Sequence, residues 1–336
     1  MEKIRELLKK ICFLPTVSSR ELDYKSELFA LAGDCFDEMY EDSFGDLVLV
    51  VKSKKPSAPR LMIDAHFDVV GFMVSKVHED GFLSISPIGG VDARVLGAAG
   101  AMVYGKECVE GVFTSTPPHL LKNSKSLPVI EDIYIDCGED ASLVEVGDIA
   151  TYKPHFTELL NNRVSATGLD DKACVCAMLD MAMHIDKERL NYDVYIVISA
   201  QEETGKGGAR FIAYDIKPDI AIITDAFFAR GEDIENCDSI EIGEGAYIDA
   251  SAVTDVFLTR GIIKALGARG MKLQVACEPS RTHTNNEAIS IAGAGVRTAL
   301  LGVAVEGMHT PSEIVSLEDI KSLSGALLEI AYGEWL

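Results

Sequence analysis

Residues 192–210, YDVYIVISAQEETGKGGAR, contain an apolar strand, YDVYIVI, that ends where a polar loop rich in glycine begins. Two adjacent glutamates, Glu202 and Glu203, stand at this transition. Neighbouring side chains of an extended chain point to opposite faces, so the two carboxylates cannot simply duplicate each other. If both serve a function, each of them has a different task.

The succession of apolar strands and helices continues on both sides of this stretch, and the alternation predicts an α/β/α sandwich. Strands are expected at 46–51, 60–66, 193–199, 219–224, 271–277 and 297–303. Helices are expected at 2–14, 19–40, 171–186, 207–214, 254–267, 286–294 and 317–334.

Residues 70–164 have a different sequence pattern, in which short runs of strand-forming residues are interrupted by glycine and proline. The segment HEDGF at 78–82 places Asp-Gly between two alternating runs, which favours a hairpin. A block with almost no helical periodicity inside an α/β frame predicts a separate small β-barrel. We therefore expect an α/β domain of residues 1–69 plus 165–336 and an inserted barrel domain of residues 70–164.

The composition excludes several classes of partner. Among the 336 residues, Asp and Glu outnumber Lys and Arg by 53 to 31, and a net charge of -22 disfavours nucleic acid as a partner. The N-terminus has no secretory signal pattern, and no apolar run approaches the length of a membrane span. Eight scattered cysteines without a CxxC pair, including the predicted core residues Cys174 and Cys176, suit a reducing compartment. We expect a cytoplasmic protein that contacts no membrane.

Residues of metal-binding types stand at the ends of several expected strands and at neighbouring turns. In open α/β sheets, ligands bind outside the carboxyl ends of the strands, so these remote places can converge on one crevice. The candidates are His66 and Asp68 in IDAHFD, Asp170 and Asp171 in GLDDKA, Glu202 and Glu203 in AQEETG, Asp225 in IITDAF, and His309 in GMHTPSE.

These residue types indicate a hydrolytic metal site. Two imidazoles and several carboxylates without a thiolate differ from a structural zinc site, which more often uses cysteine. One carboxylate can bridge two ions about 3.5 to 4 Å apart, and a bridging water then loses a proton near neutral pH. Taken singly, the motifs have plainer readings: a core histidine, an aspartate helix cap, a charged loop, and a helix start at Thr-Pro-Ser-Glu. Their joint occurrence at strand ends favours the metal site.

The chain also resembles a known family, the tetrahedral-type dimetal aminopeptidases, which include glutamyl aminopeptidases and some enzymes formerly labelled endoglucanases. The resemblance extends over nearly the whole chain and includes the inserted domain, for which it implies a PDZ-like barrel. The matching motifs are AHFDVVGFMV, GLDDKA, AQEETGKGGA, ITDA and MHTPSEIVSLEDI, together with DIYIDCGED and VGDIATY in the insert.

The resemblance implies a role for each candidate residue. By resemblance, one metal ion is held by His66, Asp170 and Asp225. The other is held by Glu203, His309 and the shared Asp170. Glu202 corresponds to the general base that takes a proton from the metal-bridging water. Asp68 corresponds to a partner that orients His66, since ligating imidazoles usually donate their other N–H to a carboxylate. Asp171 corresponds to a residue that is often joined to the bridging aspartate by a cis peptide bond.

The implied activity is metal-dependent removal of N-terminal residues from short peptides, with zinc or cobalt as the expected ions and manganese also compatible with the ligands. The implied assembly is a homo-oligomer, with a dodecamer as one form, in which the barrel domain supplies contacts and controls substrate access. Two alternatives remain open at this point. One is a dimetal deacylase of N-acyl amino acids or related amides, and the other is a catalytically degenerate oligomeric scaffold.

The chain departs from the family pattern at several positions. Val69 stands where many members have glutamate, and Lys172 stands where arginine is common, which loses a bidentate fork. The loops 278–291 and 303–308 also differ, so specificity is expected to change more than hydrolysis. His119 and His283 are open between a surface role and a substrate contact across a subunit boundary.

Overall fold

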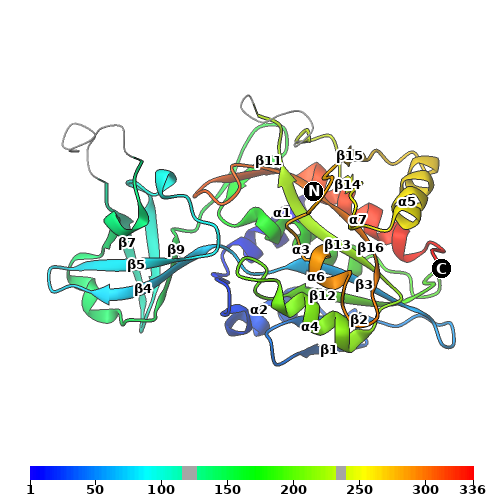
Figure 1. Ribbon diagram of the computed structural model, residues 1–336, viewed down its shortest axis with the longest axis horizontal. Helices are drawn as coiled ribbons and strands as arrows, with labels where there is room; N and C mark the ends of the chain where they lie inside the picture. Colours follow the sequence, from blue (N-terminus) through cyan, green and yellow to red (C-terminus); the bar gives the residue numbers. More distant parts are fainter. Residues whose placement is uncertain (116–126, 232–239) are drawn as a thin grey trace.

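The computed structural model describes residues 1–115, 127–231 and 240–336, so His119 lies outside the described residues. A small β-barrel lies beside a larger α/β part, to the left of it in Figure 1. Every helix in the described parts of the chain is too short or too polar to span a bilayer.

The larger part contains, in its described residues, a sheet of eleven strands. They are β1 (Glu38–Glu41), β2 (Leu47–Val51), β3 (Arg60–His66), β10 (Phe156–Glu158), β11 (Arg163–Ala166), β12 (Asp193–Ser199), β13 (Ile220–Phe228), β14 (Tyr247–Asp249), β15 (Gln274–Ala276), β16 (Arg297–Glu306) and β17 (Glu313–Ser316). The main path has the order β1-β2-β12-β3-β13-β16-β17-β11-β10, and β14 joins β15 to β16. The central strands β12, β3, β13 and β16 are parallel neighbours, whereas the outer strands of the main path pair antiparallel.

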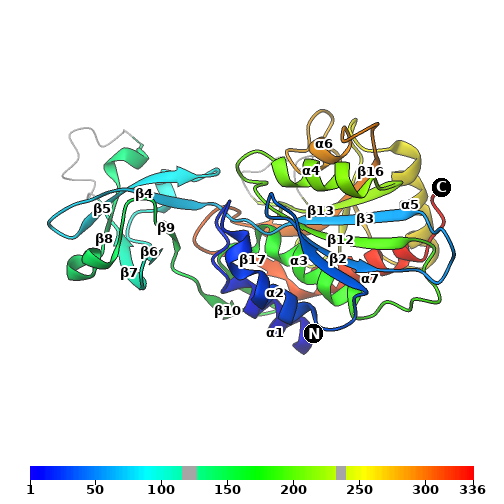
Figure 2. The ribbon, with the colours of Figure 1, turned by 90° about the horizontal axis from the view of Figure 1, so that it is seen from below.

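Helices cover both faces of this sheet. They are α1 (Glu2–Cys12), α2 (Lys25–Ala32), α3 (Leu169–Ala182), α4 (Gly207–Ile216), α5 (Val256–Ala268), α6 (Asn286–Ile289) and α7 (Leu317–Ala331). Figure 2 shows α4 and α6 above the sheet and α3 and α7 below it. In β2, Leu47 and Leu49 join the core beneath α1, α3 and α7, while Val48 and Val50 join the core beneath α4 and α6. This strand is apolar throughout because both of its faces are buried. The α/β/α prediction is confirmed.

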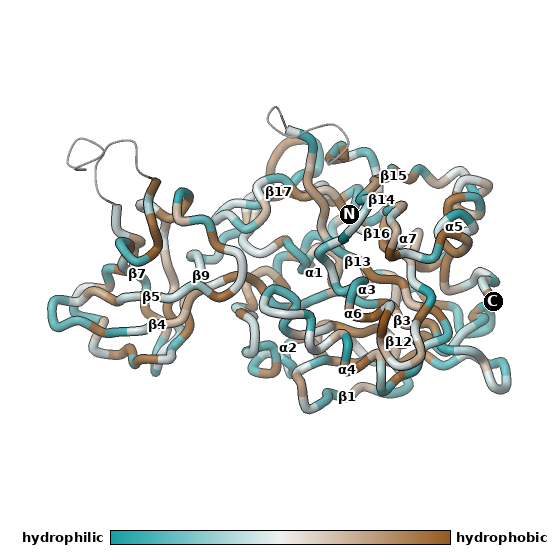
Figure 3. Tube along the Cα trace, in the orientation of Figure 1, coloured by the Kyte–Doolittle hydropathy of each residue, from teal (hydrophilic) through white to brown (hydrophobic). Residues whose placement is uncertain are grey.

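The apolar residues gather where the layers meet. Figure 3 shows hydrophobic stretches along the strands in the middle of the larger part and a hydrophilic tip on the barrel hairpin. Cys174 and Cys176 on α3 are fully buried in the core, as the sequence predicted, and Cys176 Sγ lies against the backbone oxygen of Ile4 on α1.

The barrel is closed by the strands in the order β4-β5-β8-β7-β6-β9. Its strands are β4 (Gly71–Val77), β5 (Phe82–Ile88), β6 (Gly100–Tyr104), β7 (Cys108–Phe113), β8 (Tyr134–Asp136) and β9 (Ile149–Tyr152), with short 3-10 turns η2 (Ala93–Val95), η4 (Ile130–Asp132) and η5 (Gly138–Leu143). Phe72, Phe113 and Tyr152 fill its core with ring centroids 4.9 to 5.9 Å apart. The predicted hairpin joins β4 to β5, with Gly81 at a φ of 89°.

The range expected for the insert extends beyond the barrel. The barrel strands end at Tyr152, whereas β10 pairs with β11, and β11 pairs with β17 in the large sheet. Residues 156–164 therefore lie in the α/β part. The strands β10 and β11 have only 3 and 4 residues, so their sequence carries no period that would have assigned them to either sheet.

Several expected elements differ in the structure. The helix expected at 19–40 is a 3-10 turn η1 (Glu21–Tyr24) followed by α2, and Gly33 at a φ of 74° ends it. Residues 38–41 instead form β1, because they pair with β2. The helix expected at 286–294 stops at Ile289, before two glycines with positive φ, Gly293 and Gly295. The helix start considered at Thr-Pro-Ser-Glu is wrong, since Glu313 begins β17 and the helix starts at Leu317.

Candidate metal centre

The candidate residues meet at the carboxyl edge of the parallel strands. β3 ends at His66, and Asp225 lies two residues beyond the last pair between β13 and β3. The segments that carry Glu203 and His309 directly follow β12 and β16. Asp170 lies at the start of α3, which packs against β3, β13 and β16. The strand-end rule therefore placed these residues together correctly.

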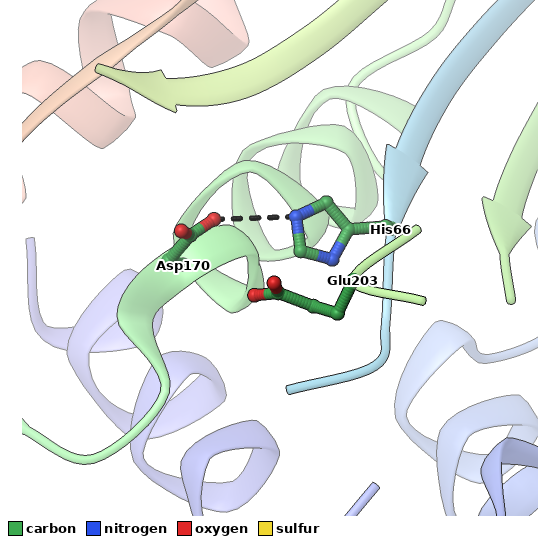
Figure 4. A group of neighbouring side chains, drawn as sticks. All are labelled: His66, Asp170 and Glu203. Atoms are coloured by element: carbon green, nitrogen blue, oxygen red, sulfur yellow. Dashed lines mark hydrogen bonds and ion pairs between the residues drawn. The ribbon is translucent and has the colours of Figure 1, made fainter. Parts of the chain in front are cut away.

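Asp170 lies at the centre of the group. His66 Nε2 lies 3.2 Å from Asp170 Oδ1 and 3.7 Å from Asp225 Oδ1. His309 Nε2 lies 3.2 Å from Asp170 Oδ2 and 3.1 Å from Glu203 Oε1. The two oxygens of Asp170 thus face two different imidazoles. Figure 4 shows how His66, Asp170 and Glu203 point toward one another from three different segments.

Two sets of three side chains each bring ligand atoms within 4.8 Å of one another, as a metal ion requires. One set is His66, Asp170 and Glu203, and the other is His66, Asp171 and Asp225. Asp171 was a candidate by residue type, although the resemblance assigned it no metal ion, and its buried carboxyl lies beside that of Asp225. The peptide bond between Asp170 and Asp171 is cis, as the resemblance implied.

The site holds buried acids next to only a few cationic groups. Burial raises the pKa of Asp225 and of Glu202 to about 7. Burial lowers the pKa of His309, but its bonds to Asp170 and Glu203 outweigh this and raise the pKa to about 11. Cations bound here would favour the charged carboxylates and so lower their pKa values. The imidazole and oxygen donors fit divalent zinc, cobalt or manganese.

Asp68 contacts His66 through its backbone oxygen, whereas the resemblance implied a contact through its carboxylate. His66 Nδ1 lies 2.9 Å from the backbone oxygen of Asp68 and 3.6 Å from its carboxylate. The carboxylate instead accepts the backbone N–H groups of Glu202 and Glu203, and it also accepts the hydroxyl of Ser18. The backbone of Asp68 therefore orients the imidazole, whereas its side chain fixes the glutamate pair.

The segment Ala200–Glu203 is held by three buried carboxylates from three other segments. Four successive backbone N–H groups each donate to one of their oxygens. The pairs are Ala200 with Asp46 at 2.8 Å, Gln201 with Glu21 at 2.9 Å, Glu202 with Asp68 at 2.9 Å, and Glu203 with Asp68 at 3.1 Å. We call Glu21, Asp46 and Asp68 the carboxylate cradle. The sequence interpretation missed Glu21 and Asp46, since no motif or spacing signals a side chain that binds a distant backbone.

Glu202 lies beside the centre and next to a pocket. Its Oε1 lies 3.0 Å from Lys206 Nζ, across the turn that precedes α4. The pocket, of about 230 Å³, borders the centre and is lined partly by the divergent loops. Its other walls are apolar residues Phe227, Phe228 and Met308 and polar residues Glu278, Thr282, His283 and Thr284.

Lys172 binds a backbone oxygen in the core. It is fully buried, and its Nζ donates to the backbone oxygen of Leu14 at 2.5 Å. Burial lowers the pKa of Lys172 to about 8. Val69, the other departure from the family pattern, packs with Val17 and Ile149 between the barrel and the α/β part.

An α/β/α sandwich with imidazoles and carboxylates gathered at the carboxyl edge of its parallel strands has the architecture of a hydrolytic enzyme. The chain belongs to the M42 glutamyl aminopeptidase family, whose model matches residues 45–325. It is therefore a peptide hydrolase of the aminopeptidase class.

Three relatives illustrate the similarity. The chain is 31% identical to the lysyl aminopeptidase of Pyrococcus furiosus, over 96% of each protein. It matches the structure of an aminopeptidase from the archaeon Desulfurococcus kamchatkensis with a TM-score of 0.92 and 26% identity, over 99% of this chain and 96% of the other. It also matches the Pyrococcus horikoshii TET1 peptidase, which can assemble into a tetrahedron or a large octahedral shell, with a TM-score of 0.86 and 27% identity over 98% of this chain and 100% of the other.

Proposed function

We propose that the protein is a dimetal aminopeptidase that removes N-terminal residues from short peptides. The observation that carries the proposal is the position of Asp170, whose two oxygens each lie 3.2 Å from a different imidazole. In this proposal, one ion is held by His66, Asp170 and Asp225. The other is held by Asp170, Glu203 and His309, so Asp170 is shared.

The donor chemistry supports divalent ions at this centre. Buried carboxylates without enough positive charge around them are costly, and bound cations offset that cost. Two imidazoles and several carboxylates suit zinc or cobalt, and manganese also accepts these ligands. When bound, the two ions supply electrophilic charge that polarises the scissile carbonyl and lowers the pKa of a water molecule.

The remaining steps fall to the chain itself. Glu202 takes a proton from the attacking water and passes it to the departing amine nitrogen. Its position suits this task, because Glu202 lines the pocket together with the candidate ligands and can reach a water molecule bound there. The carboxylate cradle holds the backbone of Glu202 and Glu203, so that one carboxylate is directed to the ions and the other to the water. The pocket beside Glu202 receives the N-terminal residue of the peptide.

The proposal predicts a metal-dependent activity on free amino termini. The purified protein should hydrolyse amino acid p-nitroanilides and short peptides, lose this activity after chelation, and regain it with zinc, cobalt or manganese. Acetylation of the substrate amino terminus should abolish turnover. Turnover that requires an N-acyl group would instead identify a deacylase, and absence of turnover on every substrate would contradict the proposal.

We also propose that the chain forms a homo-oligomer in which the barrel supplies contacts and limits access to unfolded peptides. A dodecamer is the form we favour, because the chain covers 99% of a TET peptidase whose structure has a dodecamer in the asymmetric unit. Light scattering should then give about twelve times the 36.4 kDa subunit mass, and a monomer mass would contradict it. A cytoplasmic location is part of the proposal, and the free thiols of the seven described cysteines support it.

The carboxylate cradle gives a prediction at Glu21. In Glu21→Ala the N–H group of Gln201 loses its acceptor, and the segment that carries Glu202 is no longer held at this point. We expect kcat to fall about ten- to a hundredfold with little change in KM, because loss of such a supporting partner typically has this effect.

Glu21→Gln is the matched control, since the amide keeps an oxygen that can accept the same N–H group. It should restore kcat to within a few fold of the wild type. Steady-state kinetics at a temperature where both variants are folded make the comparison. An equal loss of kcat in the two variants would show that activity depends on the charge of Glu21, and not on the oxygen that accepts the Gln201 N–H group.

A further inference from the structure

Glu313 is a buried carboxylate that has no role in the proposed reaction so far. It is the first residue of β17, pairs with Ala166 of β11, and is only 2% exposed. This pairing places its side chain beside the turn that leads into α3, where Asp170 lies. The sequence interpretation included this glutamate in a possible helix start and in a family motif but gave it no role, so its position beside the centre is known from the structure.

Three backbone N–H groups converge on this one side chain. Oε2 accepts the N–H groups of Leu169 and Asp170, the latter at 3.1 Å. Oε1 accepts the N–H group of His309 at 2.7 Å. Glu313 therefore connects the backbone of the shared aspartate with the backbone of the second histidine, although these residues are far apart in the sequence.

The backbone at both ends of this connection needs such support. His309 has a φ of 63°, a left-handed conformation that costs a non-glycine residue free energy. Gly168, just before the other contact, has a φ of 68° and is a glycine, which adopts this conformation readily. The imidazole of His309 is fixed separately, because its Nδ1 lies 2.9 Å from the backbone oxygen of Gly90. Glu313 thus fixes the position of the His309 backbone, and the backbone oxygen of Gly90 fixes the orientation of its ring.

We infer that Glu313 is a positioning residue that fixes His309 against Asp170 and thereby supports the ion held by Asp170, Glu203 and His309. The inference rests on the proposed function. The other ion also uses Asp170, but it depends less on this contact, because its remaining ligands His66 and Asp225 lie on β3 and β13 and are held by the sheet itself. Loss of Glu313 should therefore affect the two ions unequally.

The test is a titration of the ion-free protein with Co²⁺. Calorimetry measures the affinity for each ion, and visible absorption reports the surroundings of the bound cobalt. Glu313→Gln keeps the size of the side chain but points an amide NH₂ at one of the N–H donors. We expect this variant to bind one ion with the affinity of the wild type. The second ion should bind about ten- to a hundredfold more weakly, with a change in its absorption band.

Asp319→Asn is the matched control. Asp319 is also fully buried, and its two oxygens accept the N–H groups of Gly243 and Gly245 at 2.7 Å each, away from the candidate ligands. Its replacement removes the same kind of acceptor and should lower stability without changing the binding of either ion. Circular dichroism and thermal unfolding verify that both variants are folded.

The outcomes separate this inference from the proposed function. A wild type that binds no cobalt would overturn both. A wild type with two ions and a Glu313→Gln variant that binds both with unchanged affinity, or binds both equally weakly, would overturn the inference alone. If Glu313→Gln does not fold, Glu313→Asp takes its place, because it keeps the charge but is too short to reach all three donors. Failure of both to fold would assign Glu313 to folding and also overturn the inference.

Discussion

Glu202→Gln should bind two metal ions like the wild type and hydrolyse peptides at a rate lowered by at least about 10² to 10⁴, the usual contribution of a general acid–base group. Glutamine has nearly the shape of glutamate, and the backbone N–H of residue 202 would still donate to Asp68. The amide cannot take a proton from water, so the loss falls on kcat. Metal analysis beside steady-state kinetics on an amino acid p-nitroanilide makes the measurement.

Glu110→Gln is a suitable control for this prediction. Glu110 also pairs with a lysine, with its Oε2 2.7 Å from Lys153 Nζ, but the pair is exposed on the barrel. That variant should keep full activity. Near-normal turnover by Glu202→Gln would show that another group moves the proton, and loss of its metal ions would show that Glu202 is a ligand instead.

The second large effect is expected at the shared carboxylate. Asp170→Asn removes the charge that faces both imidazoles. The affinity for each ion should therefore fall by more than the ten- to hundredfold that is typical when a residue supporting a ligand is lost. Activity at low metal concentration should disappear, and added zinc or cobalt should restore it only partly. Metal content after gel filtration and activity as a function of metal concentration give the result.

Glu203→Gln provides the comparison for this variant. In the proposal Glu203 holds only one of the two ions, and its Oε1 lies 3.1 Å from His309 Nε2, so its replacement should weaken that ion and leave the other in place. A pattern in which both variants lose the same single ion would contradict a shared role for Asp170. Two tightly bound ions in Asp170→Asn would contradict its role as a ligand.

The positions of the candidate ligands could be predicted from the sequence because topology determines them. His66, Glu203, Asp225 and His309 stand at or just beyond the ends of apolar strands, and parallel strands place their carboxyl ends along one edge. The β1 strand could not be predicted in the same way. Residues 38–41 are mostly exposed, and only their pairing with β2 makes them a strand.

The residues that support the ligands were out of reach for a different reason. Glu21, Asp46 and Glu313 each accept backbone N–H groups from segments far away in the sequence. Almost every residue has a backbone N–H group, so no sequence pattern indicates which of these groups a given carboxylate will bind. Asp68 is a similar case. It was predicted to orient His66 through its carboxylate, but the atom that lies 2.9 Å from His66 Nδ1 is its backbone oxygen. Motifs indicate which side chains are candidate ligands, whereas the folded chain determines which residues hold those ligands in place.

The most direct measurement is anomalous X-ray diffraction from crystals grown with zinc or cobalt, recorded at the absorption edge of the ion. We predict two peaks about 3.5 to 4 Å apart, one bounded by His66, Asp170 and Asp225 and the other by Asp170, Glu203 and His309. Glu202 should contact neither ion directly. A single peak, or peaks that do not share Asp170, would contradict the two-metal centre proposed for this aminopeptidase.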